Sequence, residues 1–403
     1  MRRGGLCVGA LFLGVGFAPG VAKGATVTTV ADLTLMGGQN FVDGTASSFG
    51  GNVDAVVTPV VKFSDQWSLF PTYHGYYQGT EEIQSLAGGG LLFRDYTGQS
   101  FLLKSVHTLG SWKLKPSLGA TLEWLRETRD EDWGQGLYDY RKYNGGLEAE
   151  YDLSQDVGGR VAYDYYQIRF PNYQSLESAQ DPTLSRELAG EDVLNNANHM
   201  ATAGVWTSLS AKGRLEVTGM YDLRSYADQP LVDQAGQLTN TDRKDKIYFL
   251  DSTVGYPFPG PHATRLYGQL GFRYGFQNSN QNHFDAKKYS FQSNYYDYSE
   301  WRVAPEVTSS ISQGQWILSL GGSYEQRDYG SRPTQDTLGN DQDTKLYVRT
   351  ILTRLSLSHS LTPRAKLRVE GSLGWSHSNT AYEDVFKYNY RMASYGLGFS
   401  YAY

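Results

Sequence analysis

Alternation of apolar and polar residues over long segments is the feature that most constrains how this chain can fold. From Trp112 to Trp124, one set of alternate positions holds Trp, Leu, Pro, Leu, Ala, Leu and Trp, and the other holds Lys, Lys, Ser, Gly, Thr and Glu. The same two-residue period recurs at 144–153, 214–223 and 366–375. This period indicates strands with one apolar and one polar face, and the segments are well beyond the ~5–6 residues usual in soluble sheets.

The composition argues against a helical membrane protein. No run of about 18 apolar residues follows residue 24, and the mean hydropathy of the chain is −0.48. A β-barrel that crosses a membrane needs an apolar residue only at every second strand position, so its mean hydropathy can be negative. We therefore expect an all-β fold, a single closed antiparallel transmembrane β-barrel.

The N-terminus has the three-part layout of a secretory signal peptide. Met1-Arg2-Arg3 is cationic, and the stretch from Leu6 to Val21 is apolar. Either Ala22-Lys23-Gly24 or Gly20-Val21-Ala22 offers small residues for cleavage. We predict a signal peptide at 1–24 and a barrel at 25–403, with an N-terminal anchor helix as the alternative. The barrel then holds no cysteine, and its net charge falls from −6 to −9, which disfavours nucleic acid as a partner.

Reading the period along the whole chain predicts about 16 strands. The Gly-rich stretch 87–98 could hide a further hairpin, so 14 or 18 strands stay open. The predicted strands lie near 26–36, 50–63, 66–79, 99–109, 112–127, 138–153, 159–170, 197–209, 213–225, 243–256, 263–277, 297–311, 315–328, 344–360, 364–378 and 388–403.

The connections between these strands alternate between short and long. Outer-membrane barrels have short periplasmic turns and longer loops outside, so the alternation predicts the bacterial outer membrane, with the N- and C-termini periplasmic. In a soluble β-sandwich, no physical constraint makes the connections alternate between short and long.

The C-terminal strand resembles the signal that the barrel-assembly machinery of Gram-negative outer membranes recognises, with Gly398, Tyr401 and Tyr403 at the matching positions. The chain thus resembles the Gram-negative outer-membrane β-barrel (porin-like) superfamily. Segments 349–357, 376–379 and 388–403 also loosely resemble the barrel portions of surface-export proteins that carry tetratricopeptide repeats, although no such repeats are present. The first resemblance implies outer-membrane lipid, lipopolysaccharide and the barrel-assembly machinery as partners. The second implies a periplasmic export partner as an alternative.

The polar face of each strand is expected to line a lumen, because a barrel of this size leaves an aqueous channel. Equal numbers of bases and acids fall on it, so the charges favour neither ion sign. They are either a transverse field across a pore or pairs that rigidify the wall. The residues are Lys113, Lys115, Arg160, Arg214, Arg224, Arg265, Arg273, Arg302, Arg327, Lys366 and Arg368, with Glu123, Glu148, Glu150, Asp152, Asp164, Glu216, Asp222, Asp251, Glu306, Glu325 and Glu370.

The long loop 171–196 contains a candidate helix that starts with Asp181-Pro182. Folded inward, it would narrow the pore and place Arg186, Glu187, Glu191 and Asp192 on its lining. Folded outward, it would lie over the rim.

Aromatic residues are expected as girdles at the two lipid interfaces, and Tyr163, Tyr165, Tyr256, Tyr274, Tyr395 and Tyr401 fit this role. Tyr166 and Tyr267 fall on the lumenal face, where they could instead stack on sugars. None of the seven histidines lies in a metal-spaced pair or a nucleophile motif, so we predict no catalytic residue, metal or cofactor.

These observations favour an outer-membrane channel for small hydrophilic solutes with a loop-narrowed lumen, and no enzyme. The alternative is an export or assembly barrel that works with a periplasmic protein. A barrel enzyme is a third hypothesis.

Overall fold

The computed structural model describes residues 25–47, 49–85, 91–126, 131–173, 192–209, 212–261, 264–285, 288–383 and 387–403. The predicted signal peptide at 1–24 lies outside this part of the chain. No helix within it is long and apolar enough to cross a membrane.

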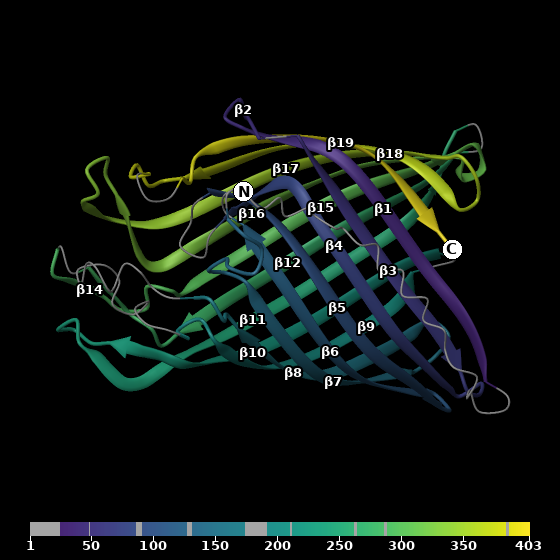
Figure 1. Cartoon of the computed structure of the whole chain (residues 1–403), viewed down its shortest axis with the longest axis horizontal. Helices are drawn as coiled ribbons and strands as arrows, with labels where there is room; N and C mark the ends of the chain where they lie inside the picture. Colours follow the sequence, from purple (N-terminus) through teal and green to yellow (C-terminus); the bar gives the residue numbers. More distant parts are fainter. Residues whose placement is uncertain are drawn as a thin grey trace, which may run out of the picture.

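Sixteen long strands form one closed antiparallel barrel (Figure 1), which confirms the predicted fold class and strand number. Each strand pairs with the next along the chain, and the ring closes where β19 pairs with β1 from Asp32↔Ala402 to Val42↔Met392. The strands are β1 Thr26–Val42, β3 Gly50–Lys62, β4 Trp67–Ser85, β5 Leu91–Leu109, β6 Trp112–Arg126, β7 Tyr140–Asp152, β8 Val157–Arg169, β9 Asn196–Leu209, β10 Gly213–Val232, β11 Leu238–Pro259, β12 Arg265–Ser279, β15 Tyr298–Ile311, β16 Trp316–Gln335, β17 Asp341–Ser360, β18 Ala365–Ser378 and β19 Tyr390–Ala402.

Short elements fill some of the connections. They are β2 Thr45–Ala46, the pair β13 His283–Asp285 and β14 Ser290–Gln292, and the 3-10 turn η3 Ser312–Gly314. The Gly-rich stretch 87–98 hides no extra hairpin among its described residues, because β5 already begins at Leu91.

The outer face of the barrel is apolar, as the alternation predicts. Leu118, Val161 and Leu397 are each more than half exposed in the isolated chain. The six tyrosines predicted for the girdles are exposed on this same face. An apolar surface of this extent is stable where lipid covers it.

Loop lengths differ from the prediction at the end of the barrel opposite the short turns. The expected loops 226–242 and 329–343 are hairpins in which β10–β11 and β16–β17 continue beyond the ring. Their registers shift at Pro230 and Pro333 and then resume. Proline has no N–H to donate to the neighbouring strand, and the register shifts at both prolines. The shift interrupts the two-residue period, so the sequence predicted that the strands end there, although the pairing continues beyond the prolines.

Candidate functional site: the barrel lumen

The inner face of the barrel carries the charged side chains, and most of them form ion pairs. On β6 and β7, Lys115 lies 2.7 Å from Glu148 and also pairs with Glu150, while Lys113 lies 3.0 Å from Asp152. The register brings these residues together because Lys113 lies opposite Glu150 and Lys115 opposite Glu148. Paired charges on neighbouring strands hold each other in place along the wall.

The predicted lumen residues pair in the same way elsewhere. The Glu216 carboxylate forms ion pairs with Arg160 at 3.0 Å and with Arg214 at 3.1 Å. Further pairs are Arg273 with Asp251 at 2.6 Å, Arg327 with Glu300 at 2.8 Å, Arg368 with Glu370 at 2.6 Å and Arg224 with Asp222 at 3.9 Å. Exposed pairs of this kind contribute about 0–1 kcal/mol each, so they order the wall more than they stabilise it.

Other predicted site residues have different surroundings. Arg265 and Glu325 face the lumen by their strand parity, and Glu325 lies opposite Arg302 in the register. Asp192 is exposed at the base of the long loop, where its carboxylate accepts a hydrogen bond from Asn195 at 2.6 Å. Arg186, Glu187 and Glu191 lie outside the described residues, so the inward loop stays a prediction.

Sequence reasoning missed several lumenal charges, including Lys104, Glu300 and Arg354. Lys104 lies 3.9 Å from Glu148, and Glu300 holds Arg327. Glu300 lies two residues from the assigned Arg302 on the same predicted strand, so its side chain faces the same side. Arg354 also lies within a predicted strand, at an alternate position that faces the lumen. Applying the parity rule to every charged residue would have found them.

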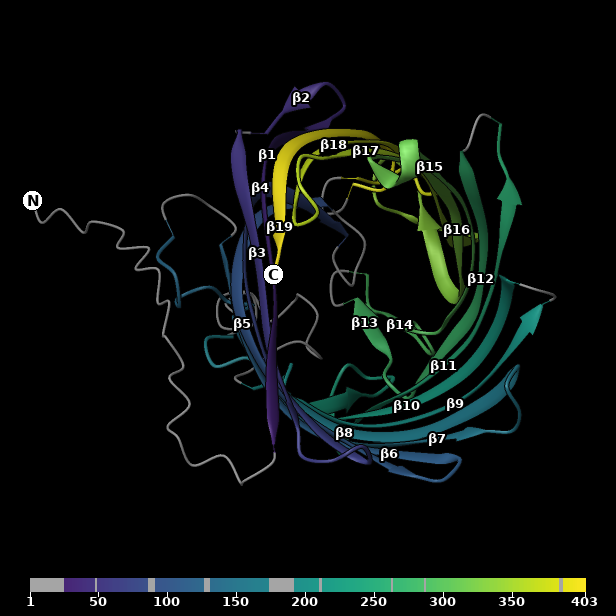
Figure 2. The same cartoon turned by 90° about the vertical axis from the view of Figure 1, so that its right-hand side faces the viewer.

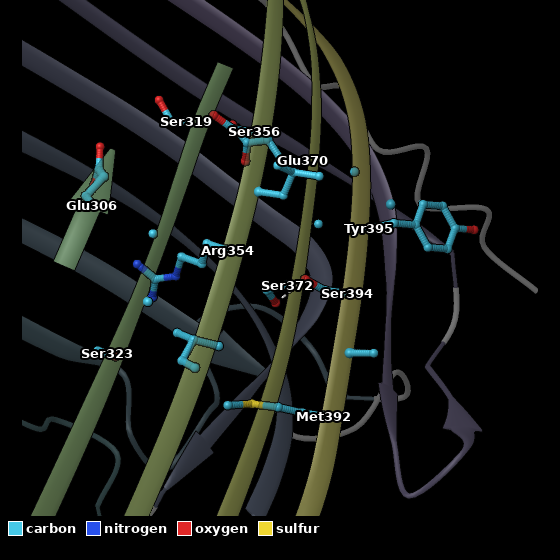
Figure 3. Close-up of a pocket in the computed structure, with 18 of the residues that line it drawn as sticks. Glu306, Ser319, Ser323, Arg354, Ser356, Glu370, Ser372, Met392, Ser394 and Tyr395 are labelled. Atoms are coloured by element: carbon cyan, nitrogen blue, oxygen red, sulfur yellow. Dashed lines mark hydrogen bonds between the residues drawn. The ribbon is translucent and has the colours of Figure 1, made fainter. Parts of the chain in front are cut away.

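A cavity of about 710 Å³ lies against one side of the lumen wall. Many of its lining residues are glycine or serine, among them Gly321 and also Ser372 and Ser394, which Figure 3 labels. Figure 3 also shows Tyr395 pointing away from this cavity, as expected for a girdle residue. Small side chains leave the lumen wide here, and the charged Arg302, Glu306, Arg354 and Glu370 stand within it.

The connection between β12 and β15 occupies the mouth of the barrel. We call its described residues, 280–285 and 288–297, the mouth segment. Figure 1 places β14 at the end opposite the C-terminus, and Figure 2, which looks along the barrel, shows β13 and β14 inside the ring of strands. The mouth segment therefore lies within this end of the ring.

Two hairpins hold the mouth segment. On the β10–β11 side, Gln281 is fully buried and accepts a hydrogen bond from the Val232 N–H at 3.2 Å, and its amide donates to the Pro230 carbonyl at 3.0 Å. On the β16–β17 side, Lys288 lies 2.7 Å from Asp341. Burial alone would lower the pKa of the Lys288 amine, but bonds to the carboxylates of Asp341 and Asp285 outweigh it and raise that pKa. Lys288 therefore stays charged at neutral pH.

An arginine–tyrosine cluster packs beneath the mouth segment. Arg243 bonds Asp245 at 2.8 and 2.9 Å, and its guanidinium lies 4.8 Å from the Tyr226 ring centroid and 4.5 Å from that of Tyr296. Asp245 is fully buried. Arginine stacks on aromatic faces while it pairs with a carboxylate, so this cluster anchors Tyr296 of the mouth segment to the barrel wall.

One histidine has a serine beside it, which sequence reasoning could not place. Ser105 Oγ lies 2.9 Å from His107 Nε2, and Trp67 Nε1 donates to the same hydroxyl at 3.0 Å. The imidazole stacks on Trp67. Both residues have the outward parity of β5, so the pair belongs to an aromatic cluster on the lipid-facing side. The described residues contain no group of three or more His, Cys, Asp and Glu that could hold a metal ion.

No protein-family model matches the chain, and no curated protein matches it in sequence. Several solved structures match most of its length, with TM-scores below 0.5. OmpT, an outer membrane protein of Vibrio cholerae, is 12% identical, with 94% of this chain and 99% of that chain covered and a TM-score of 0.48. OccAB1 of Acinetobacter baumannii is 10% identical, with 93% and 96% covered and a TM-score of 0.47. An anion-selective porin from Comamonas acidovorans is 8% identical, with 94% and 100% covered and a TM-score of 0.45. At these identities the likeness concerns the fold alone.

Proposed function

We propose that this protein is a channel of the bacterial outer membrane that passes small hydrophilic solutes, with both termini on the periplasmic side. The observation that carries the proposal is the contrast between the two faces of one closed barrel. The outer face is apolar with aromatic residues near both edges, and the inner face is polar, charged and hollowed by a cavity of about 710 Å³. A ring of 16 strands is wide enough for water and small solutes to pass.

The mouth segment supplies the narrowing that the function requires for selectivity. It lies inside the ring of strands, and it is held by Gln281 on one side and Lys288 on the other. The long loop 171–196 remains a second candidate for this role, as the sequence predicts. In either case, selection would come from size and lumen charge rather than from chemistry.

Conductance of the purified protein in a planar bilayer tests this proposal. We expect discrete channels in KCl, and a higher conductance when residues 282–296 are replaced by a short Gly-Ser linker, because the closed ladder of strands holds the barrel without them. Deletion of 178–194 is the matched experiment on the other loop. Absence of channels from all three proteins would refute the open pore.

The export hypothesis makes a different prediction for the same experiment. A wild-type barrel that conducts nothing, beside a linker variant that conducts well, would point to a plug that a periplasmic partner displaces. The enzyme hypothesis is tested through Ser105 and His107: we expect no ester hydrolysis by the purified barrel in lipid micelles, and no change in the Ser105→Ala variant.

A further inference from the structure

Two opposite charges stand on either side of a glycine in the lumen wall. In the register, Glu306 of β15 lies opposite Gly321 of β16, and Gly321 lies opposite Arg354 of β17. Neighbouring strands are about 4.8 Å apart, so the two Cα atoms are separated by roughly 10 Å. Both side chains line the cavity.

Neither charge is neutralised within the described part of the chain. No ion pair involves Glu306 or Arg354 there, and the Glu306 carboxylate accepts one hydrogen bond, from the Thr308 hydroxyl at 3.3 Å. Both residues are exposed to the lumen. They differ in this from the nearby Arg368 and Glu370, which pair with each other at 2.6 Å.

Gly321 leaves the space between the two charges open. A Cβ at this position would lie 3.4 Å from Glu306 Cγ and 3.6 Å from its Oε2, so the carboxylate leans over β16. Figure 3 shows the guanidinium of Arg354 reaching from β17 over the same strand. The two groups thus face a common patch of wall that carries no side chain.

We propose that Glu306, Gly321 and Arg354 form a binding site for small dipolar solutes, the class that contains amino acids and short peptides. The solute carboxylate would accept hydrogen bonds from Arg354, and its ammonium group would donate to Glu306. The two charges of such a solute are a few ångströms apart, and each would lie about 2.9 Å from its partner in the wall. Glu306 repels a solute that carries only a negative charge, and Arg354 repels one that carries only a positive charge. The site therefore disfavours simple anions and simple cations.

This inference deepens the proposed channel function and rests on it. It is tested by titrating the single-channel current in KCl at pH 7 with β-alanine, propionate and propylammonium, three probes of similar size. We expect β-alanine to reduce the current saturably, at concentrations where the other two have little effect. Glu306→Gln and Arg354→Gln should each raise the half-blocking concentration of β-alanine by roughly tenfold.

Control variants separate this site from the general charge of the lumen. Lys366→Gln and Asp152→Asn each remove one lumenal charge outside the cavity and should leave the block unchanged. The double exchange Glu306→Arg with Arg354→Glu reverses the dipole and should restore block by β-alanine. Propionate that blocks as strongly as β-alanine, or single variants that block like the wild type, would overturn the proposal.

Saturation-transfer NMR measures the equilibrium binding of β-alanine to the folded protein in detergent. This measurement tests the binding site separately from the channel function. Conductance without this binding overturns the site and leaves the channel. Binding that Glu306→Gln abolishes, in a barrel that does not conduct, upholds the site and overturns the channel.

Discussion

Val161 and Ala162 offer a direct test of which face of the barrel meets lipid. They are adjacent on β8, so their side chains point to opposite sides of the wall. Val161 is 57% exposed, and its registered neighbours are Ala149 and Ala203. Ala162 lies opposite Glu148, on the lumenal face. The same substitution by arginine at each position therefore probes two different surroundings.

The cost at Val161 follows from its depth. It lies four residues from the start of β8 and four from Tyr165, the outer of the two girdle residues on this strand. With a rise of about 3.4 Å per residue and a tilt of about 40°, each interval spans roughly 10 Å of the ~25 Å apolar band. Val161→Arg therefore puts a cation near the midplane, which costs about 2–4 kcal/mol, or roughly 30- to 700-fold in the unfolding equilibrium constant.

Ala162→Arg should change the stability by no more than about 1 kcal/mol, because the new side chain meets water and the Glu148 carboxylate. Leu109→Arg is the control for depth: Leu109 is 57% exposed but lies at the short turn beside Trp112, where the cost falls to about 0–1 kcal/mol.

Reversible urea unfolding in phospholipid vesicles, followed by tryptophan fluorescence, measures all three variants. A cost at Ala162 equal to or above that at Val161 would mean that the two faces are reversed. An equal cost at Leu109 and Val161 would mean that the apolar band is not centred where the structure places it.

Three further predictions concern the ends of the barrel. Deleting residues 401–403 should leave unfolded protein in the periplasm without a heat-dependent gel shift, since these residues carry the predicted assembly signal; normal folding would make the terminal resemblance accidental. Arg243→Ala should lower the urea midpoint, because it leaves the Asp245 carboxylate buried and unpaired, at a cost of about 3–5 kcal/mol. Replacing Asp245 by Asn in the same protein should recover part of this loss. A tag at Gln234 should be accessible on intact cells and one at Pro363 should not, and labelling at Pro363 would reverse the proposed orientation.

The alternation along each strand was sufficient to predict most of the fold and the composition of the lumen. Whether a side chain points inward or outward depends on its parity within one strand, which is a local property. For this reason, the strand near Trp112, the lumenal Lys115 and the girdle residue Tyr395 are where the sequence predicted them. At most positions the lumenal charges form ion pairs, as in the interpretation in which they rigidify the wall.

Other features depend on contacts between residues far apart in the sequence. Arg354 and Glu306 become neighbours across Gly321 through the register of three strands, which no single segment specifies. The mouth segment contains no long strand with a two-residue period. Its position depends on the hydrogen bond of Gln281 to one hairpin and the ion pair of Lys288 with another. The sequence alone therefore determined the barrel and the chemistry of its two faces. The tertiary structure decided which charges meet and which segment lies in the mouth, because register and loop packing are set by long-range contacts.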